Sequence, residues 1–277
     1  MADTKSLRTR IKSVDSTLHL TKAMGLVASS KIRRASAAMA HGRDYADALG
    51  SAIKMLAASP ECGKSPYMAV REGERIRLIV VAGDRGLAGG YNANVFRLYR
   101  DFLAEHPAAQ ITPIPIGKRA CDRFSGSDDK FLSAERFSCD EVDGLAARLC
   151  ADFAAGEYDR LCILCTRYVS LMTQTAEVRD ILPLKKEDGA SHGMLFEPDE
   201  MTVLQNAVPL YVAGVIASAV RESFACEVAA RRMAMDSAGK NAQMMIDDLQ
   251  LAYNRARQGA ITQEITEIVA GASAGSN

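Results

Sequence analysis

The most regular pattern of apolar residues lies in the first 56 positions, where it repeats with heptad spacing. Alternating steps of four and three residues from Leu7 select fifteen positions, and twelve of them are Ala, Val, Ile, Leu or Met. A lone amphipathic helix loses phase with a 3.5-residue repeat over this length, so the pattern predicts a left-handed coiled coil. Pro60 ends the predicted helix, which over residues 3–58 would be roughly 80 Å long.

A second long helix is predicted at the other end of the chain, over 206–277. Pro209 would lie in its first turn, where proline is tolerated, and no later proline interrupts it. Its apolar residues recur at helical spacing at Ile246, Leu249, Tyr253, Ala256, Ala260, Ile261, Ile265, Ile268 and Ala272. Because a heptad seam needs a partner, we expect the two terminal helices to pair.

The middle of the chain changes from long helical patterns to short strands alternating with helices. Strands are predicted at Arg75–Ala82, Ile111–Ile116, Arg160–Leu164 and Thr173–Leu184, with helices at Ala93–Glu105 and Asp140–Ala155. This alternation is typical of a small, mainly parallel, Rossmann-like α/β domain. Inserted between the two long helices, such a domain makes their pairing antiparallel.

The predicted fold class is therefore mainly α, or α+β: a long antiparallel coiled coil with an inserted α/β domain. We expect three regions, a coiled-coil helix over 1–59, the α/β domain over 70–200 and a second coiled-coil helix over 206–277. If the first helix ends near 58 opposite the start of the second near 209, paired residue numbers add to about 267. Gly25 and Ala28 would then face Ala242 and Gly239, and these small residues would form a narrow waist.

Composition adds an uneven distribution of charge to this picture. The 277 residues carry a formal net charge of zero, with 48% hydrophobic and 25% charged residues, as in an ordinary folded protein. Residues 1–43 nevertheless hold nine Lys or Arg against two Asp, a surplus of seven positive charges. Seven cysteines, an odd number, favour reduced thiols in the cytosol. We expect no membrane span and no secretory signal, because no apolar run is long enough and the basic N-terminus lacks an apolar core.

Two segments resemble phosphate-binding loops by their letters. Gly83–Asn92 follows a predicted strand and precedes a helix, but its spacing is G-x-x-G-x-x-G-G and lacks the acidic residue of a dinucleotide site. Gly63-Lys64-Ser65 follows a helix rather than a strand, so its backbone amides cannot converge on a phosphate. A tight loop that packs a helix onto the sheet is the better interpretation of Gly83–Asn92.

Two further motifs also favour a structural interpretation. Gly189–Gly193 spells G-x-S-x-G, but it lies in a polar segment without the strand that a nucleophile elbow needs. Cys162 and Cys165 lie three apart on a predicted strand, so they point to opposite faces and cannot share a metal or a disulfide. The four histidines form no ligand pattern. We therefore expect no catalytic residue, no cofactor and no metal site.

Other classes of function remain open from the residues alone. An α/β enzyme with helical extensions would bind a small molecule as an isolated chain. A coiled-coil nucleic-acid binder would show salt-sensitive binding to DNA. In such binders the basic cluster precedes the heptads, whereas here Lys and Arg are threaded through them, which favours an acidic protein surface as the partner.

Both ends of the chain resemble the gamma subunit of F-type ATP synthases. The resemblance is carried by Leu7–Val14 and Leu20–Ala35 at the N-terminal end and by Leu249–Ala272 at the other. Gly83–Asn92 is similar to a loop of that family, with Gly83 where the family has Ser, and Phe196–Asp199 is similar to its foot motif. The resemblance extends over the whole chain and is weak from about 95 to 190.

The resemblance implies a central rotor shaft. The coiled coil would stand inside a ring of α and β subunits, with the α/β domain on the membrane ring of c subunits and beside the epsilon subunit. Ion flow would turn the shaft, and catalysis would take place on the β subunits. The chain would be a peripheral protein at the cytoplasmic face of a bacterial plasma membrane, attached only through the complex, and would bind no nucleic acid.

The resemblance also implies which residues contact partners. Matching positions within the sleeve of α and β subunits are Met24, Arg231, Arg257, Gln258, Thr262 and Glu264. Glu197 would lie on the side of the foot and the c ring.

Overall fold

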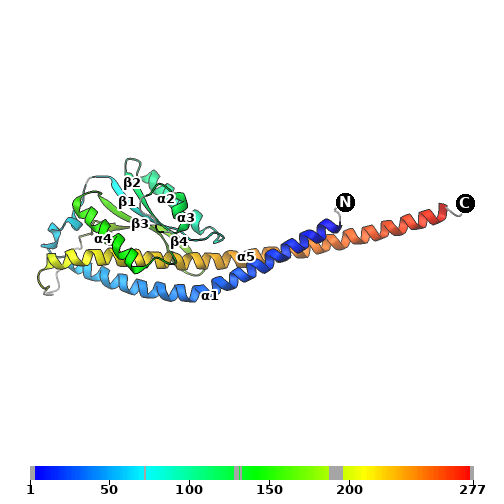
Figure 1. Ribbon diagram of the computed structural model, residues 1–277, viewed down its shortest axis with the longest axis horizontal. Helices are drawn as coiled ribbons and strands as arrows, with labels where there is room; N and C mark the ends of the chain where they lie inside the picture. Colours follow the sequence, from blue (N-terminus) through cyan, green and yellow to red (C-terminus); the bar gives the residue numbers. More distant parts are fainter. Residues whose placement is uncertain (1–3, 72, 128–130, 132, 187–195, 275–277) are drawn as a thin grey trace. The chain divides into compact units, whose positions relative to one another are not determined.

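The computed structural model describes residues 4–71, 73–127, 131, 133–186 and 196–274 (Figure 1). The chain divides into two compact units, one of Ala28–Arg231 and one that joins Met1–Val27 to Arg232–Asn277. Two long helices, α1 (Thr4–Ala57) and α5 (Glu200–Ala274), contribute residues to both units. The boundary between the units therefore falls within these helices rather than at their ends. The motif Gly189–Gly193 lies outside the described residues.

The larger unit contains the inserted α/β domain. Its elements after α1 are the short 3₁₀ helices η1 (Cys62–Lys64) and η2 (Pro66–Met68), then β1 (Arg75–Val81), α2 (Tyr91–Glu105), β2 (Gln110–Ile116), α3 (Lys118–Arg123), α4 (Cys139–Ala155), β3 (Arg160–Tyr168) and β4 (Gln174–Leu182). The strand order is β2-β1-β3-β4, with β1 parallel to β2 and β3 and with β4 antiparallel to β3. The predicted mainly parallel sheet is confirmed, and the short helix α3 was not expected.

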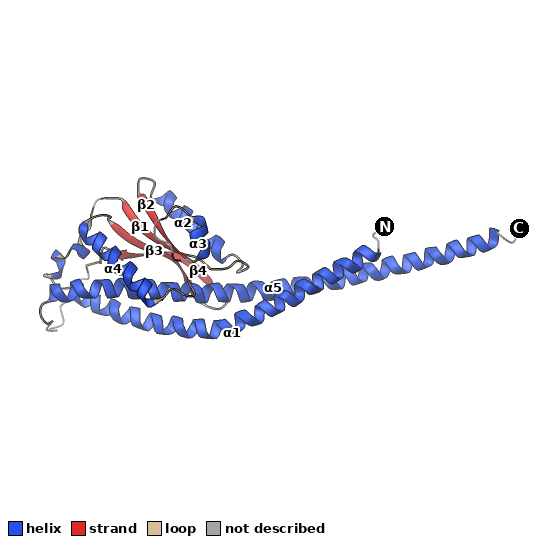
Figure 2. Cartoon of the chain, in the orientation of Figure 1, coloured by secondary structure: helices blue, strands red, loops and turns tan. Residues whose placement is uncertain are grey.

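The sheet lies between two layers of helices (Figure 2). Because side chains alternate along a strand, Ile76, Leu78 and Val80 of β1 face α2 and α3, whereas Ile79 and Val81 face the other side. On that other side α4 packs together with segments of α1 and α5. Both long helices thus supply part of the core of the α/β unit.

Helix α5 begins earlier than the sequence pattern suggested. It starts at Glu200 instead of 206, and Asp199 caps it by accepting hydrogen bonds from the Thr202 backbone N–H and hydroxyl, both at 2.8 Å. These bonds hold the pKa of Asp199 below its ordinary value. Pro209 consequently lies inside the helix, not in its first turn, where it removes one backbone hydrogen bond.

One stretch of α5 is more apolar than expected. No membrane span was predicted, yet an 18-residue window within Glu200–Gly271 has a mean hydropathy of 1.6, which meets the length and composition of a span. Half of that window is buried inside the protein. This burial is the pattern of a core helix, and it agrees with the packing of α5 under the sheet.

The second unit is a pair of helix segments, the start of α1 and the end of α5. Leu18 packs with Ala242 and Ile246 in a small buried cluster, joined by Val14. This contact confirms that the two terminal helices pair.

The register of the pair differs from the predicted one by a heptad. A Cβ atom on Gly25 would lie 3.7 Å from Cβ of Met235, and one on Gly239 would lie 3.6 Å from the Thr21 hydroxyl oxygen. Gly25 thus lies opposite Met235 and Gly239 opposite Thr21, so paired residue numbers add to 260 rather than about 267. The prediction was wrong because α5 begins nine residues before Pro209, which had been taken as its start. Each glycine therefore lies opposite a larger residue than predicted, Met235 for Gly25 and Thr21 for Gly239.

Candidate functional site

The end of α5 forms an exposed surface beyond the paired segment. In the observed register Thr4, the first described residue of α1, reaches only the level of residue 256. Every residue from 257 to 271 is exposed. Ile261, Ile265 and Ile268 share one face at helical spacing, and Ile268 is 71% exposed. Such an apolar stripe on an exposed helix indicates a surface that another protein covers.

Four of the predicted partner contacts lie on this exposed end. Arg257, Gln258, Thr262 and Glu264 are all exposed, and the Thr262 hydroxyl donates to the Gln258 carbonyl oxygen at 2.9 Å. They flank the isoleucine stripe, so polar and apolar groups alternate around this part of α5. A surface of this composition suits a protein partner that contacts the helix from more than one side.

Met24 is half-buried on α1, and it lies between exposed apolar residues on the same face. Leu20, Met24 and Val27 follow one another at spacings of four and three residues, and both Leu20 and Val27 are more than half exposed. The buried side of the same segment carries Leu18 and Thr21, which face α5. The helix therefore has apolar groups on its outer face as well as at the seam.

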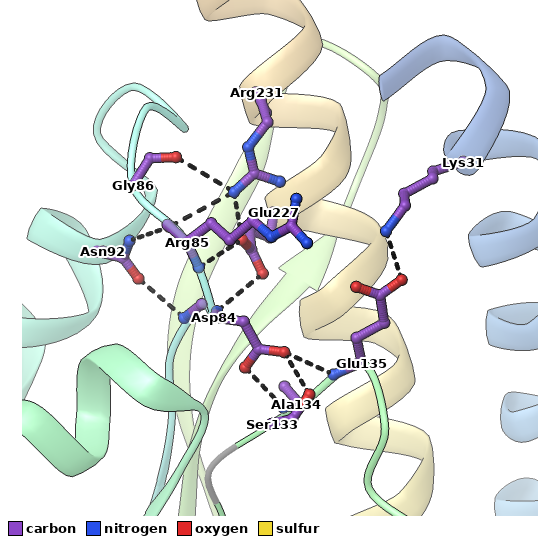
Figure 3. A network of polar contacts seen from close by, with 11 residues as sticks. Lys31, Asp84, Arg85, Gly86, Asn92, Ser133, Ala134, Glu135, Glu227 and Arg231 are labelled. Atoms are coloured by element: carbon purple, nitrogen blue, oxygen red, sulfur yellow. Dashed lines mark hydrogen bonds and ion pairs between the residues drawn. The ribbon is translucent and has the colours of Figure 1, made fainter. Parts of the chain in front are cut away.

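Arg231 is placed differently from the other predicted contacts. Its side chain is only 13% exposed and forms an ion pair with Glu227. It also donates to the carbonyl oxygens of Arg85 and Gly86, at 3.4 and 3.3 Å (Figure 3). Arg231 is therefore used within the α/β unit, and it holds the loop between β1 and α2 against α5.

Glu227 is the centre of this network. Its side chain is 2% exposed and accepts hydrogen bonds from the backbone N–H groups of Asp84 and Arg85, both at 3.3 Å. A Cβ atom on Gly83 would lie 2.8 Å from the Glu227 carboxyl carbon, so a larger residue at position 83 would require the Glu227 side chain to shift. The backbone N–H groups of the glycine-rich loop thus donate to α5. This supports the interpretation of Gly83–Asn92 as a structural loop.

The Asp84 side chain connects the same loop to the segment before α4. It accepts from the Ser133 hydroxyl at 2.6 Å and from the backbone N–H groups of Ala134 and Glu135 at 2.8 and 3.1 Å. Glu135 in turn pairs with Lys31 of α1 (Figure 3). A chain of polar contacts therefore extends from α5 through the loop to α1.

Glu222 is a second buried carboxylate on α5. It pairs with Arg43 of α1 and Arg179 of β4, and accepts from the Tyr168 backbone N–H at 2.9 Å. Burial alone would raise the pKa of Glu222, but the bonds from Arg43, Tyr168 and Arg179 hold it below its ordinary value. Sequence reasoning missed Glu222 and Glu227, although two acids within the apolar stretch of α5 were a visible signal.

The cysteines are mostly buried and chemically quiet. Cys162 contacts the core beneath α2, whereas Cys165 contacts the core on the opposite face, which confirms that the two thiols point apart. Burial raises the pKa of each to about 12, so neither is ionised near neutral pH. Among the residues that the structure describes, no three His, Cys, Asp or Glu are grouped to hold a metal ion.

Glu197 lies just before α5, in the segment Phe196–Asp199. The side chain is exposed, and so are the neighbouring Pro198 and Asp199. This position leaves Glu197 accessible to a partner.

Comparison with known proteins agrees with this architecture. A family model described as ATP synthase matches residues 3–274. A central stalk and c-ring structure of the Tetrahymena thermophila mitochondrial ATP synthase shares 20% identity at a TM-score of 0.64, covering 79% of this chain and 99% of that chain.

Two structures from the Euglena gracilis mitochondrial ATP synthase are also similar. The OSCP/F1/c-ring structure in rotational state 3 matches with 19% identity and a TM-score of 0.72, over 98% of this chain and 94% of that chain. The rotor in rotational state 1 matches with 18% identity and a TM-score of 0.66, over 93% and 98%. At these identities the likeness establishes the fold.

Proposed function

Because the chain belongs to the ATP synthase gamma family, we propose that it is the rotating central stalk of a proton-translocating F-type ATP synthase. In this role the helical pair stands within a sleeve of α and β subunits. The α/β domain over 70–200 serves as the foot on the c ring, beside the epsilon subunit. The chain itself catalyses no reaction and needs no cofactor, because the β subunits carry the catalytic sites.

The exposed end of α5 is the observation that best supports this role. The isoleucine stripe of residues 261–268 lies on a helix that α1 no longer covers. An uncovered apolar stripe is costly in water, and a surrounding sleeve of subunits removes it from solvent. The family contact positions Arg257, Gln258, Thr262 and Glu264 flank this stripe.

Rotation of the stalk can be coupled to catalysis because the faces of the stalk carry different side chains. A shaft with different side chains on each face has a different interaction free energy with each neighbouring subunit. Turning the shaft then changes which catalytic site is favoured in its open or closed conformation. The surplus of seven positive charges in residues 1–43 suits acidic surfaces on those neighbours.

The residues proposed to contact partners now have distinct roles. Met24, with its exposed neighbours Leu20 and Val27, contacts the sleeve from α1. Glu197 contacts the c-ring side at the foot. Arg231 acts indirectly, because its side chain already holds the loop at Arg85 and Gly86.

Within the complex the chain is peripheral to the membrane, and we place it at the cytoplasmic face of a bacterial plasma membrane. Affinity purification of the tagged chain from its native membranes tests the assignment. We expect the α and β subunits, the epsilon subunit and the c ring to co-purify in fixed proportions. A tag on an unrelated cytosolic protein is the control. Recovery of the chain without α and β subunits would overturn the proposal.

A further inference from the structure

The carboxylate of Glu222 connects three parts of the protein at one point. Its donors come from α1 through Arg43, from β3 through the Tyr168 backbone N–H, and from β4 through Arg179. Arg43 also donates to the Tyr168 carbonyl oxygen at 3.1 Å. One side chain of α5 thereby joins both long helices to the sheet.

Whether the contacts of Glu222 resist movement of the helices against the sheet depends on the kind of contact. Apolar packing is non-directional, so by itself it sets no particular pairing of groups between the helices and the sheet. Hydrogen bonds to a carboxylate need defined distances and angles, and those to ionised groups are the stronger ones. Because the Glu222 side chain is 2% exposed, sliding would leave a charge buried without partners. The contacts of Glu222 therefore oppose sliding of the helices along the sheet.

Glu227 provides a second connection, which directly joins fewer elements of the fold. It lies five residues further along α5 and binds the loop at Asp84 and Arg85, together with Arg231 of its own helix. These contacts connect α5 directly to the α/β domain, and they reach α1 only indirectly, through Asp84, Glu135 and Lys31. Glu222 pairs with α1 directly, through Arg43.

We propose that Glu222 is a positioning residue that transmits torque between the α/β domain and both long helices. This inference rests on the proposed role of the chain as a rotating stalk. The domain receives the turning force at the foot, and Glu222 passes it to α5 and, through Arg43, to α1. Loss of the carboxylate lets the sheet slip against the helices under load.

The test uses the complete ATP synthase in membrane vesicles and the variant Glu222→Gln. Glutamine keeps the shape of the side chain but loses its charge and turns an NH₂ group toward groups that are themselves donors. ATP hydrolysis and ATP-driven proton pumping are measured together while the opposing proton gradient is raised. We expect hydrolysis to continue while the number of protons pumped per ATP falls below the wild-type value, and we expect this deficit to grow as the opposing gradient is raised.

Asp159→Asn is the matched control for a merely structural effect. Asp159 is also 2% exposed, and it accepts from the Arg75 backbone N–H and guanidinium at 2.9–3.1 Å. Both residues of this pair lie within the α/β domain, away from α1 and α5. We expect Asp159→Asn to lower thermal stability but to keep the wild-type ratio of pumping to hydrolysis.

Arg43→Met is a second variant, in case Glu222→Gln fails to assemble. Arg43 is 40% exposed, and its loss leaves Glu222 paired with Arg179. We expect a smaller fall in the ratio and partial recovery in Arg43→Lys. If both Glu222→Gln and Arg43→Met keep the wild-type ratio, or if Asp159→Asn lowers it equally, Glu222 does not transmit torque. If vesicles whose complex lacks this chain still couple hydrolysis to pumping, the proposed function itself is wrong.

Discussion

A pair of cysteines at positions 25 and 235 should form a disulfide between the two long helices. A Cβ atom on Gly25 lies 3.7 Å from Cβ of Met235, inside the range of about 3.5–4.5 Å that disulfides require. In the register that the sequence suggested, Gly25 would lie opposite Ala242 instead. That position is seven residues, or about 10 Å, further along α5, which is too far for a disulfide between 25 and 235.

The assay is oxidation of the double variant Gly25→Cys/Met235→Cys, with Cys139→Ser to remove the exposed native thiol. Diamide is added to the folded chain, free thiols are titrated, and the cross-linked peptides are identified after proteolysis. The comparison variant is Gly25→Cys/Ala242→Cys in the same background. We expect the first pair to cross-link and the second to remain reduced. Faster cross-linking of the second pair would refute the register.

The proposed partner contacts, the absence of catalysis by this chain and the pairing of Glu222 can each be tested. Met24→Lys should lower proton pumping more than ATP hydrolysis, because a new ion pair of about 1 kcal/mol with an acidic partner alters the energy of rotation. Pumping and hydrolysis are measured in the same membranes, and an unchanged ratio of pumping to hydrolysis would contradict this prediction. Glu197→Lys should weaken pumping while leaving the hydrolysis of the detached catalytic part unchanged, and normal pumping in membranes would count against the placement of Glu197 at the c ring. The purified chain alone should hydrolyse no ATP, and activity that stays with it through repeated chromatography would show that the chain is itself catalytic. Acid should destabilise the wild type more than Glu222→Gln. The pKa of Glu222 in the folded protein lies below its ordinary 4.5, so its carboxylate contributes stability above pH 4.5 and loses it as the pH falls through the folded pKa. Urea unfolding of both proteins at neutral and acid pH measures the difference, and equal losses of stability would exclude this contribution.

The long helices and the sheet could be predicted because their signals are local. The heptads from Leu7 define α1, and the apolar run after Arg75 defines β1 within one residue of its observed end. The opposite orientation of Cys162 and Cys165 follows from the alternation of side chains along a strand. Each of these inferences needs only the spacing of residues within a single element.

The register and the buried carboxylates could not be predicted in the same way. The register depends on where α5 begins, and Pro209 gave a false start because a proline inside a helix resembles one in a first turn. Glu222 and Glu227 interrupt an apolar stretch of α5, but this signal does not show which residues pair with them. Their burial depends on Arg43, Arg179 and the β1–α2 loop, which are far away in the sequence.

If this chain is the rotor, it turns relative to the α and β subunits, and this rotation can be observed in single complexes. A bead is attached through Met172→Cys, an exposed position on the α/β domain, in a Cys139→Ser background, while the α and β subunits are fixed to a surface. On addition of ATP, we expect the bead to turn in one direction, in steps that stop when hydrolysis is inhibited. A bead that stays fixed while the immobilised complex hydrolyses ATP would contradict the assignment of this chain as the rotor.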